Sequence, residues 1–327
     1  MMSLTIKGKQ EQEVDRTQVS FAKAQLVLFQ SRKKFAFLYC LATVTGLFCL
    51  PGVFEALASP TSNFLVLIQM TLPLPLASLL VTAGTYIMND LVDADLDRAN
   101  GKKRPIPSGL VSKRQAWTFV ALAFGAAVLL TVVTFSPISM VIVTLMLGIG
   151  VTYSLPPVAL MKRFMIKTVS IAVFYILCAL LGMTSVYNLD LAMDSPVLVA
   201  SVLLTLALMV FISSTLNDMG DVDGDKAAGR RTVPIVLGKE NTIKLTMVLA
   251  AGVLAITWGY YLMALIAGHS RPVTVATTTA IASIVLMTLG RLRKEFQNAE
   301  FMRSQHKKLF PLQLIIHPSL ITGVAIF

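Results

Sequence analysis

Long apolar segments recur along the whole chain, and they restrict its possible folds more than any other feature. Each has about 17–25 residues, which is enough to cross the hydrocarbon core of a bilayer as an α-helix. That core offers no water to the backbone, so a spanning segment must pair its N–H and C=O groups internally. We count nine such segments, at residues 35–55, 64–88, 117–135, 138–155, 167–186, 197–216, 245–267, 273–290 and 309–327. The sequence therefore predicts an all-α, polytopic membrane protein with about nine transmembrane helices.

The composition and the start of the chain agree with this class. Hydrophobic residues make up 55% of the chain and charged residues 14%, whereas soluble domains carry about 25% charged residues. The first 34 residues are polar, and the first apolar run comes too late for a signal peptide. We expect residues 1–34 to form a cytoplasmic amino-terminal segment and residues 35–327 to form one transmembrane domain.

The basic residues are distributed to one side of the predicted membrane. Of the 28 Lys and Arg residues, all but Arg271 fall in the amino-terminal segment or in loops on the same side as that segment. Because Lys and Arg collect in cytoplasmic loops, we expect the amino terminus to be cytoplasmic. The net charge of +11 then suits anionic membrane lipids and diphosphates. No pattern typical of nucleic-acid binding is present.

A cluster of carboxylates follows the second apolar segment directly. The first motif, residues 89–109, reads NDLVDADLDRANGKKRPIPSG. If the helix continues through it, the spacing puts four side chains on one face, namely Asn89, Asp90, Asp93 and Asp97. Like charges at this spacing repel one another, so the arrangement favours a bound cation with oxygen ligands, such as Mg²⁺. Asp95 points away from this face.

The same pattern occurs a second time, in residues 217–238. Asn217, Asp218, Asp221 and Asp225 repeat the register of the first cluster residue for residue. In this register Asp93 and Asp221 are equivalent, each central in its acidic face. One such face could be an ordinary solvated helix end, but two in the same register favour a metal site. Because each half of the chain carries one such motif, the sequence suggests a bundle of two four-helix repeats around a central cavity.

Basic residues stand close to both acidic clusters. Arg98 and Arg104 follow the first cluster, and Lys226 follows the second. A loop between the halves begins at Tyr153 and leads to Lys162. A metal-bound diphosphate needs cation bridges on one side and Lys or Arg hydrogen bonds on the other, which these residues could supply. The alternatives are the general excess of positive charge in cytoplasmic loops and, for Tyr153, an aromatic interface anchor.

These motifs resemble those of the UbiA superfamily of intramembrane prenyltransferases. The first family motif, NDxxDxxxD followed by RPIPSG, is matched in full by residues 89–97 and 104–109. The second, DxxxDxxxD followed by TLPxxxG, is matched by Asp221, Asp225 and residues 232–238, and the Tyr-Ser-x-Pro-Pro loop by residues 153–157. The first acidic position of the second motif is Asn217, which leaves open whether Asn217 or Asp218 is a metal ligand.

The resemblance implies a chemistry and a set of roles. A polyprenyl diphosphate would be held by Mg²⁺ between the acidic faces, and ionisation would give an allylic cation that an acceptor captures. The implied metal ligands are Asn89, Asp90, Asp93, Asp97, Asn217, Asp218, Asp221 and Asp225. The implied catalytic residues are Asp93, Asp97, Asp221, Asp225 and Lys162. The implied substrate contacts are Arg98, Arg104, Tyr153 and Lys226.

The acceptor is the least constrained part of this interpretation. The ending TVPIVLG of the second motif looks more like the branch with digeranylgeranylglyceryl phosphate synthases and the menaquinone, tocopherol and chlorophyll enzymes. Lipid-soluble or amphipathic acceptors of both kinds, glycerol-phosphate lipid and aromatic ring, are compatible with it, and we favour the lipid. A UbiA-type terpene cyclase and a transporter are the less favoured alternatives, since intramembrane carboxylates also mark carriers.

Overall fold

The computed structural model describes residues 19–50, 53, 68, 71–99, 103–185, 195–268 and 272–325. Within these ranges the regular structure is entirely helical and contains no strand, which confirms the predicted all-α class. The long helices are α1 (Phe21–Phe48), α4 (Pro73–Val92), α6 (Lys113–Val132), α7 (Pro137–Ser154), α8 (Ile166–Met183), α10 (Pro196–Gly220), α13 (Lys239–Ile266), α14 (Pro272–Leu292) and α15 (Ala299–Ala325).

Several of these helices have the length and apolarity that a membrane crossing requires. In the described residues six qualify, namely α6, α7, α8, α10, α13 and α14. Large apolar side chains such as Leu129 and Ile266 lie exposed on the outside of the bundle, where lipid replaces water. The chain is therefore an integral membrane protein. The count of nine crossings and the division into two repeats stay predictions.

Two helix boundaries differ from those expected from the apolar segments. Helix α1 starts at Phe21, well before residue 35, because its first turns are bound to the rest of the fold. There Gln25 Nε2 donates to the Gln115 carbonyl over 3.2 Å, and Leu28 is fully buried. Helix α4 begins at Pro73, so Pro73 and Pro75 stand in its first turn, where a missing N–H breaks no helical hydrogen bond.

Helices α1 and α8 approach each other very closely. A Cβ atom on Gly46 would lie 1.8 Å from the Ala179 carbonyl oxygen, and one on Gly182 would lie 2.0 Å from that of Thr43. Small residues at such crossings let two backbones come into contact inside a membrane. This contact joins the amino-terminal helices to α8, which in turn packs against α10.

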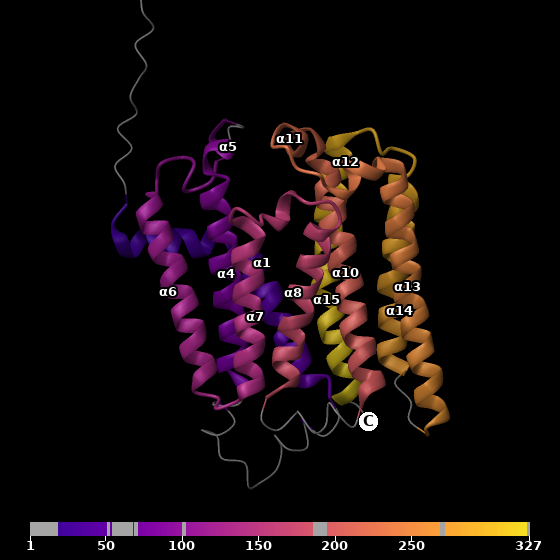
Figure 1. Cartoon of the computed structure of the whole chain (residues 1–327). Coiled ribbons are helices and arrows are strands. Elements are labelled where there is room, and N and C mark those ends of the chain that lie inside the picture. The colour runs from indigo at the N-terminus through magenta and orange to yellow at the C-terminus, as the bar shows by residue number, and fades with distance from the viewer. Residues whose placement is uncertain are drawn as a thin grey trace, which may run out of the picture.

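The two acidic segments lie at the same end of the bundle. Helices α4, α6 and α7 stand on one side and α10, α13, α14 and α15 on the other, with α8 between them (Figure 1). The short helices α5 (Ala94–Ala99) and α11 (Val222–Ala227), which follow α4 and α10, both project from the top of this view. Helix α12 (Val233–Leu237) lies beside α11. The fold thus brings the two motifs to one end of the bundle.

Candidate functional site

The first acidic motif lies at the junction of α4 and α5. Asp93 caps α4 with an N–H bond to the Asn89 carbonyl of 3.0 Å, and the Asp97 N–H bonds the Asp93 carbonyl over 2.8 Å, so the helical path nearly continues. The side chains of Asp90, Asp93 and Asp97 are buried, whereas 74% of the Asp95 side chain is exposed. The helical-face argument therefore predicted which carboxylates turn inward.

Arginines compensate the buried carboxylates of this motif. Arg32 binds Asp90 with two N–H groups, one of them Nε at 2.7 Å from Oδ2. Arg104 Nη1 lies 2.8 Å from Asp90 Oδ1 and 2.6 Å from Asp97 Oδ2. Arg104 was predicted to contact substrate, and it stands inside the acidic cluster.

The second motif follows the same register, and its helix breaks at the equivalent residue, since α4 ends at Val92 before α5 begins at Ala94. Helix α10 ends at Gly220, and the backbone turns at Asp221 (φ −117°, ψ 16°) before α11 begins. Asp218 and Asp225 are buried, while Asn217 and Asp221 are exposed. Asp218 rather than Asn217 therefore faces the interior. The expected equivalence of Asp93 and Asp221 does not extend to burial, since Asp93 is buried and Asp221 is exposed. The backbone at Asp221 also departs further from helical geometry than that at Asp93 (φ −86°, ψ 1°).

Two basic side chains reach the inward carboxylates of the second motif. Lys167 Nζ, at the start of α8, lies 2.5 Å from Asp218 Oδ1. Arg230 spans the two motifs, with Nη2 2.5 Å from Asp93 Oδ2 and Nη1 3.3 Å from Asp225 Oδ1. Burial raises the pKa of the Asp225 carboxyl, although Lys167 and Arg230 oppose the shift.

Lys167 and Arg230 were not among the predicted site residues, and nor was Arg32. A lysine just inside an apolar segment is the signal for Lys167, because an ammonium at that depth requires a carboxylate partner. Three predicted basic residues lie farther out instead. Lys162 and Lys226 have exposed side chains, and Arg98 binds the exposed Asp95 over 3.2 Å. The roles of these three residues stay predictions, and the structure adds Lys167, Arg230 and Arg32 as ion-pair partners of the buried carboxylates.

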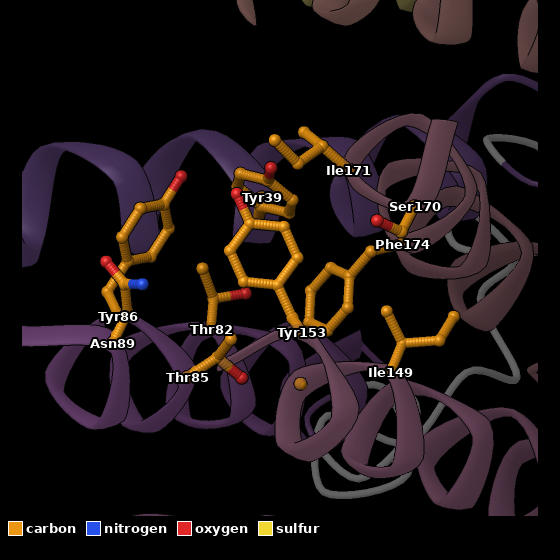
Figure 2. A pocket seen from close by; sticks show the side chains of 11 residues that line it. Tyr39, Thr82, Thr85, Tyr86, Asn89, Ile149, Tyr153, Ser170, Ile171 and Phe174 are labelled. Atoms are coloured by element: carbon orange, nitrogen blue, oxygen red, sulfur yellow. The ribbon is translucent and has the colours of Figure 1, made fainter. Parts of the chain in front are cut away.

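A cavity of about 90 Å³ extends from the first motif into the bundle. Asn89 and Tyr86 lie at one end of it, Tyr153 in the middle, and Ile149 and Phe174 at the other end (Figure 2). Its walls come from α1, α4, α7 and α8. Tyr153 thus lines a mostly apolar and aromatic cavity whose polar end contains a residue of the acidic motif.

The donor atoms fit a hard divalent cation, although they are not gathered as expected. Among the residues described, no three carboxylate, imidazole or thiol groups converge on one point as metal ligands. Guanidinium and ammonium groups stand between the carboxylates, and metal binding between the two acidic faces stays a prediction. The buried oxygens Asp218 Oδ2 and Asp225 Oδ2 nevertheless have no hydrogen-bond partner in the described part of the chain. Oxygens of this kind are the ligands that Mg²⁺ prefers.

Comparison with known proteins decides the family. A model of the UbiA prenyltransferase family matches residues 45–308, which include both motifs and the cavity helices α4, α7 and α8. The chain belongs to the UbiA prenyltransferase family. It is therefore a membrane-embedded prenyltransferase, as the motifs predicted.

Individual relatives of this UbiA protein carry two kinds of name. The digeranylgeranylglyceryl phosphate synthase of Methanoculleus marisnigri is 29% identical over 235 residues, covering 69% of this chain and 78% of the relative. The homogentisate phytyltransferase of Synechocystis sp. is 28% identical over 229 residues, covering 64% of this chain and 74% of the relative.

Solved structures share the fold at lower identity. A digeranylgeranylglyceryl phosphate synthase superimposes with a TM-score of 0.67 at 18% identity, covering 94% of this chain and 99% of that protein. A UbiA homologue from Archaeoglobus fulgidus, solved with DMAPP and Mg²⁺, gives a TM-score of 0.61 at 15% identity, covering 93% of this chain and 100% of that protein. These likenesses confirm the UbiA fold of the chain.

Proposed function

We propose that this prenyltransferase moves a polyprenyl group, such as geranylgeranyl, from its diphosphate to a glycerol-phosphate lipid. One observation carries the placement of the substrate. Asn89 belongs both to the first acidic motif and to the wall of the aromatic cavity. A diphosphate at the motifs would therefore have its isoprenoid tail directed into the cavity beside Tyr86 and Tyr153.

The proposed site holds Mg²⁺ on the inward carboxylates. Asp218 and Asp225 each have a buried carboxylate oxygen with no partner among the described residues. Asp93, from the first motif, binds the same Arg230 side chain as Asp225. A divalent cation there would neutralise the charge of the departing diphosphate. The A. fulgidus homologue, whose structure contains DMAPP and Mg²⁺, supports this assignment. Asn89, Asp90, Asp97 and Asp221 complete the proposed set around these three, and Asp218 takes the ligand role in place of the exposed Asn217.

The reaction breaks the allylic C–O bond, and its electron pair leaves with the diphosphate. An acceptor oxygen then bonds to the allylic carbon and loses its proton. Lys167, Arg104 and Arg230 stand where they could donate hydrogen bonds to diphosphate oxygens, which stabilises the leaving charge. The mostly apolar and aromatic lining of the cavity would disfavour water, which would otherwise capture the cation.

An assay with each candidate acceptor in turn tests the identity of the acceptor. Purified protein in detergent receives geranylgeranyl diphosphate, Mg²⁺ and either geranylgeranylglyceryl phosphate or homogentisate, and products are identified by mass. We expect transfer to the lipid, in line with the name of the M. marisnigri relative. The homogentisate phytyltransferase relative favours an aromatic acceptor as the second candidate. Transfer to homogentisate alone would refute the lipid assignment.

We also propose that both motifs and the amino terminus face the cytoplasm. The one-sided distribution of Lys and Arg supports this orientation. Single cysteines at Ser108 and Lys239, in a variant without the three native cysteines, test it. An impermeant thiol reagent added outside intact cells should not label them, and labelling would reverse the orientation.

A further inference from the structure

Arg230 differs from the other basic residues of the site because it connects the two motifs. Its guanidinium binds Asp93, at the end of α4, and Asp225, in α11. Arg104, in contrast, pairs with two carboxylates of the first motif. Arg230 therefore occupies the space between the acidic faces, where a bridging cation would have its greatest attraction to both.

The pairing of Arg230 is incomplete on both sides. Asp225 Oδ2 and Arg230 Nε are buried and have no hydrogen-bond partner among the residues described. The bond to Asp225 is also long, at 3.3 Å. Buried polar atoms without partners destabilise an arrangement, so this contact leaves both groups able to gain better partners.

The chain around Arg230 lets the side chain move while the backbone stays in place. The Arg230 N–H bonds the Asp225 carbonyl over 2.9 Å, and the Arg231 N–H bonds the Lys162 carbonyl over 3.0 Å. Gly229, with φ of +65°, makes the turn that precedes them. The backbone is thus fixed on two sides, and only the long side chain must rotate to leave the carboxylates.

We infer that Arg230 is an internal cation that competes with the divalent metal for Asp93 and Asp225, and that the metal releases it to bind the diphosphate. This inference rests on the proposed function. A divalent ion on these carboxylates repels the guanidinium and replaces its single charge with two. The freed guanidinium has a fork of donors that matches phosphate oxygens. Arg230 can pair either with the carboxylates or with the diphosphate, but not with both at the same time. Metal binding to the carboxylates and diphosphate binding to Arg230 therefore favour each other.

Calorimetry on the full-length protein in detergent tests the competition. Arg230→Gln should bind Mg²⁺ about ten-fold more tightly than the wild type in the absence of diphosphate, because a bonded competing charge is gone. At saturating Mg²⁺ the same variant should bind inorganic diphosphate about ten-fold more weakly. Arg231→Gln is the matched control, since Arg231 is exposed and the charge change is identical. It should alter both affinities by less than about two-fold.

Whether Arg230→Gln raises or lowers the affinity for Mg²⁺ distinguishes this role from that of a permanent structural bridge. If Arg230 merely held the motifs together, its removal would disorganise the carboxylates and weaken Mg²⁺ binding. Unchanged or weaker Mg²⁺ binding by Arg230→Gln therefore overturns the inference while leaving the proposed function intact. A wild-type protein that binds neither Mg²⁺ nor inorganic diphosphate overturns both. If Arg230→Gln does not fold, Arg230→Lys replaces it. A lysine lacks the fork of donors with which Arg230 pairs with both carboxylates, so the Mg²⁺ affinity of Arg230→Lys should still rise, and no rise overturns the inference.

Discussion

The two acidic motifs have the same register in sequence and different charge environments in the structure. In the first, Arg32 and Arg104 bind Asp90 and Asp97. In the second, Asp218 retains an oxygen without a described partner although Lys167 binds the other one. The register fixes where the carboxylates stand, whereas the basic side chains from other elements fix what each can still bind.

This difference assigns the motifs unequal tasks. The arginines of the first motif come from α1 and from the loop after α5, so they tie these segments to α4. The second motif has fewer cationic partners and open acceptor oxygens, which makes it the better point of entry for a metal ion. Asp93 is part of the first motif, but we group it with the metal-binding carboxylates of the second, since it shares Arg230 with Asp225.

Removal of the metal should reduce activity more than any single substitution, because both motifs lose their cation together. Chelation with EDTA should reduce prenyl transfer below detection, because clustered carboxylates repel a diphosphate unless cations intervene. Activity is measured as inorganic diphosphate release from geranylgeranyl diphosphate, before and after readdition of excess Mg²⁺. Recovery with Mg²⁺ is expected, and turnover that persists after exhaustive chelation would contradict the metal site.

Replacement of Lys167 should break the second motif selectively. Lys167→Met leaves Asp218 buried and uncompensated, which costs about 3–5 kcal/mol when a buried ion pair loses one partner. Turnover should fall by ~10²–10³-fold, since one preorganised electrostatic contact to the leaving group is lost. Thermal unfolding in detergent and turnover at saturating Mg²⁺ measure the two effects. Lys244→Met, with its exposed side chain, is the matched control, and an equal loss there would contradict the assigned role of Lys167.

The neighbours Asn217 and Asp218 test the register of the second motif. Asp218→Asn removes the charge of an inward carboxylate, and turnover should drop by about 100-fold because a metal ligand is weakened. Asn217→Ala alters an exposed side chain and should cost less than about five-fold. Turnover of both variants at several Mg²⁺ concentrations measures the difference, and only Asp218→Asn should be partly rescued by more metal. Larger losses at Asn217 would return the ligand role to that position.

Much of this site follows from sequence, and the parts that do not have identifiable causes. Helical spacing alone separates Asp93 from Asp95 and brings Asp90 and Asp97 inward. It could not identify Arg230, because the contact with Asp93 depends on how the loop between α11 and α12 folds back over the first motif. It also placed Asp221 inward, whereas Asp221 is exposed and its backbone departs further from helical geometry than that of Asp93 at the equivalent helix end. Tertiary contacts and helix ends are the two features that periodicity does not encode.

The smallest expected effect provides the strictest test of the helical-face argument. Asp93 and Asp95 are two residues apart, yet the first is buried against Arg230 and the second is exposed between Arg98 and Lys113. Surface ion pairs of that kind contribute about 0–1 kcal/mol, so Asp95→Asn should change turnover by less than about five-fold. Asp93→Asn removes the same charge from the same segment and should reduce turnover by ~10²–10³-fold.

Because the two substitutions alter the local charge equally, a difference between them reports position alone. Turnover of each variant is measured at saturating Mg²⁺, with thermal unfolding as a check on folding. Equal losses would mean that total negative charge near the membrane surface controls activity, and that the orientation of the carboxylates does not. A large loss at Asp93 with almost none at Asp95 would show that the first motif acts through its buried face, despite having more cationic partners than the second.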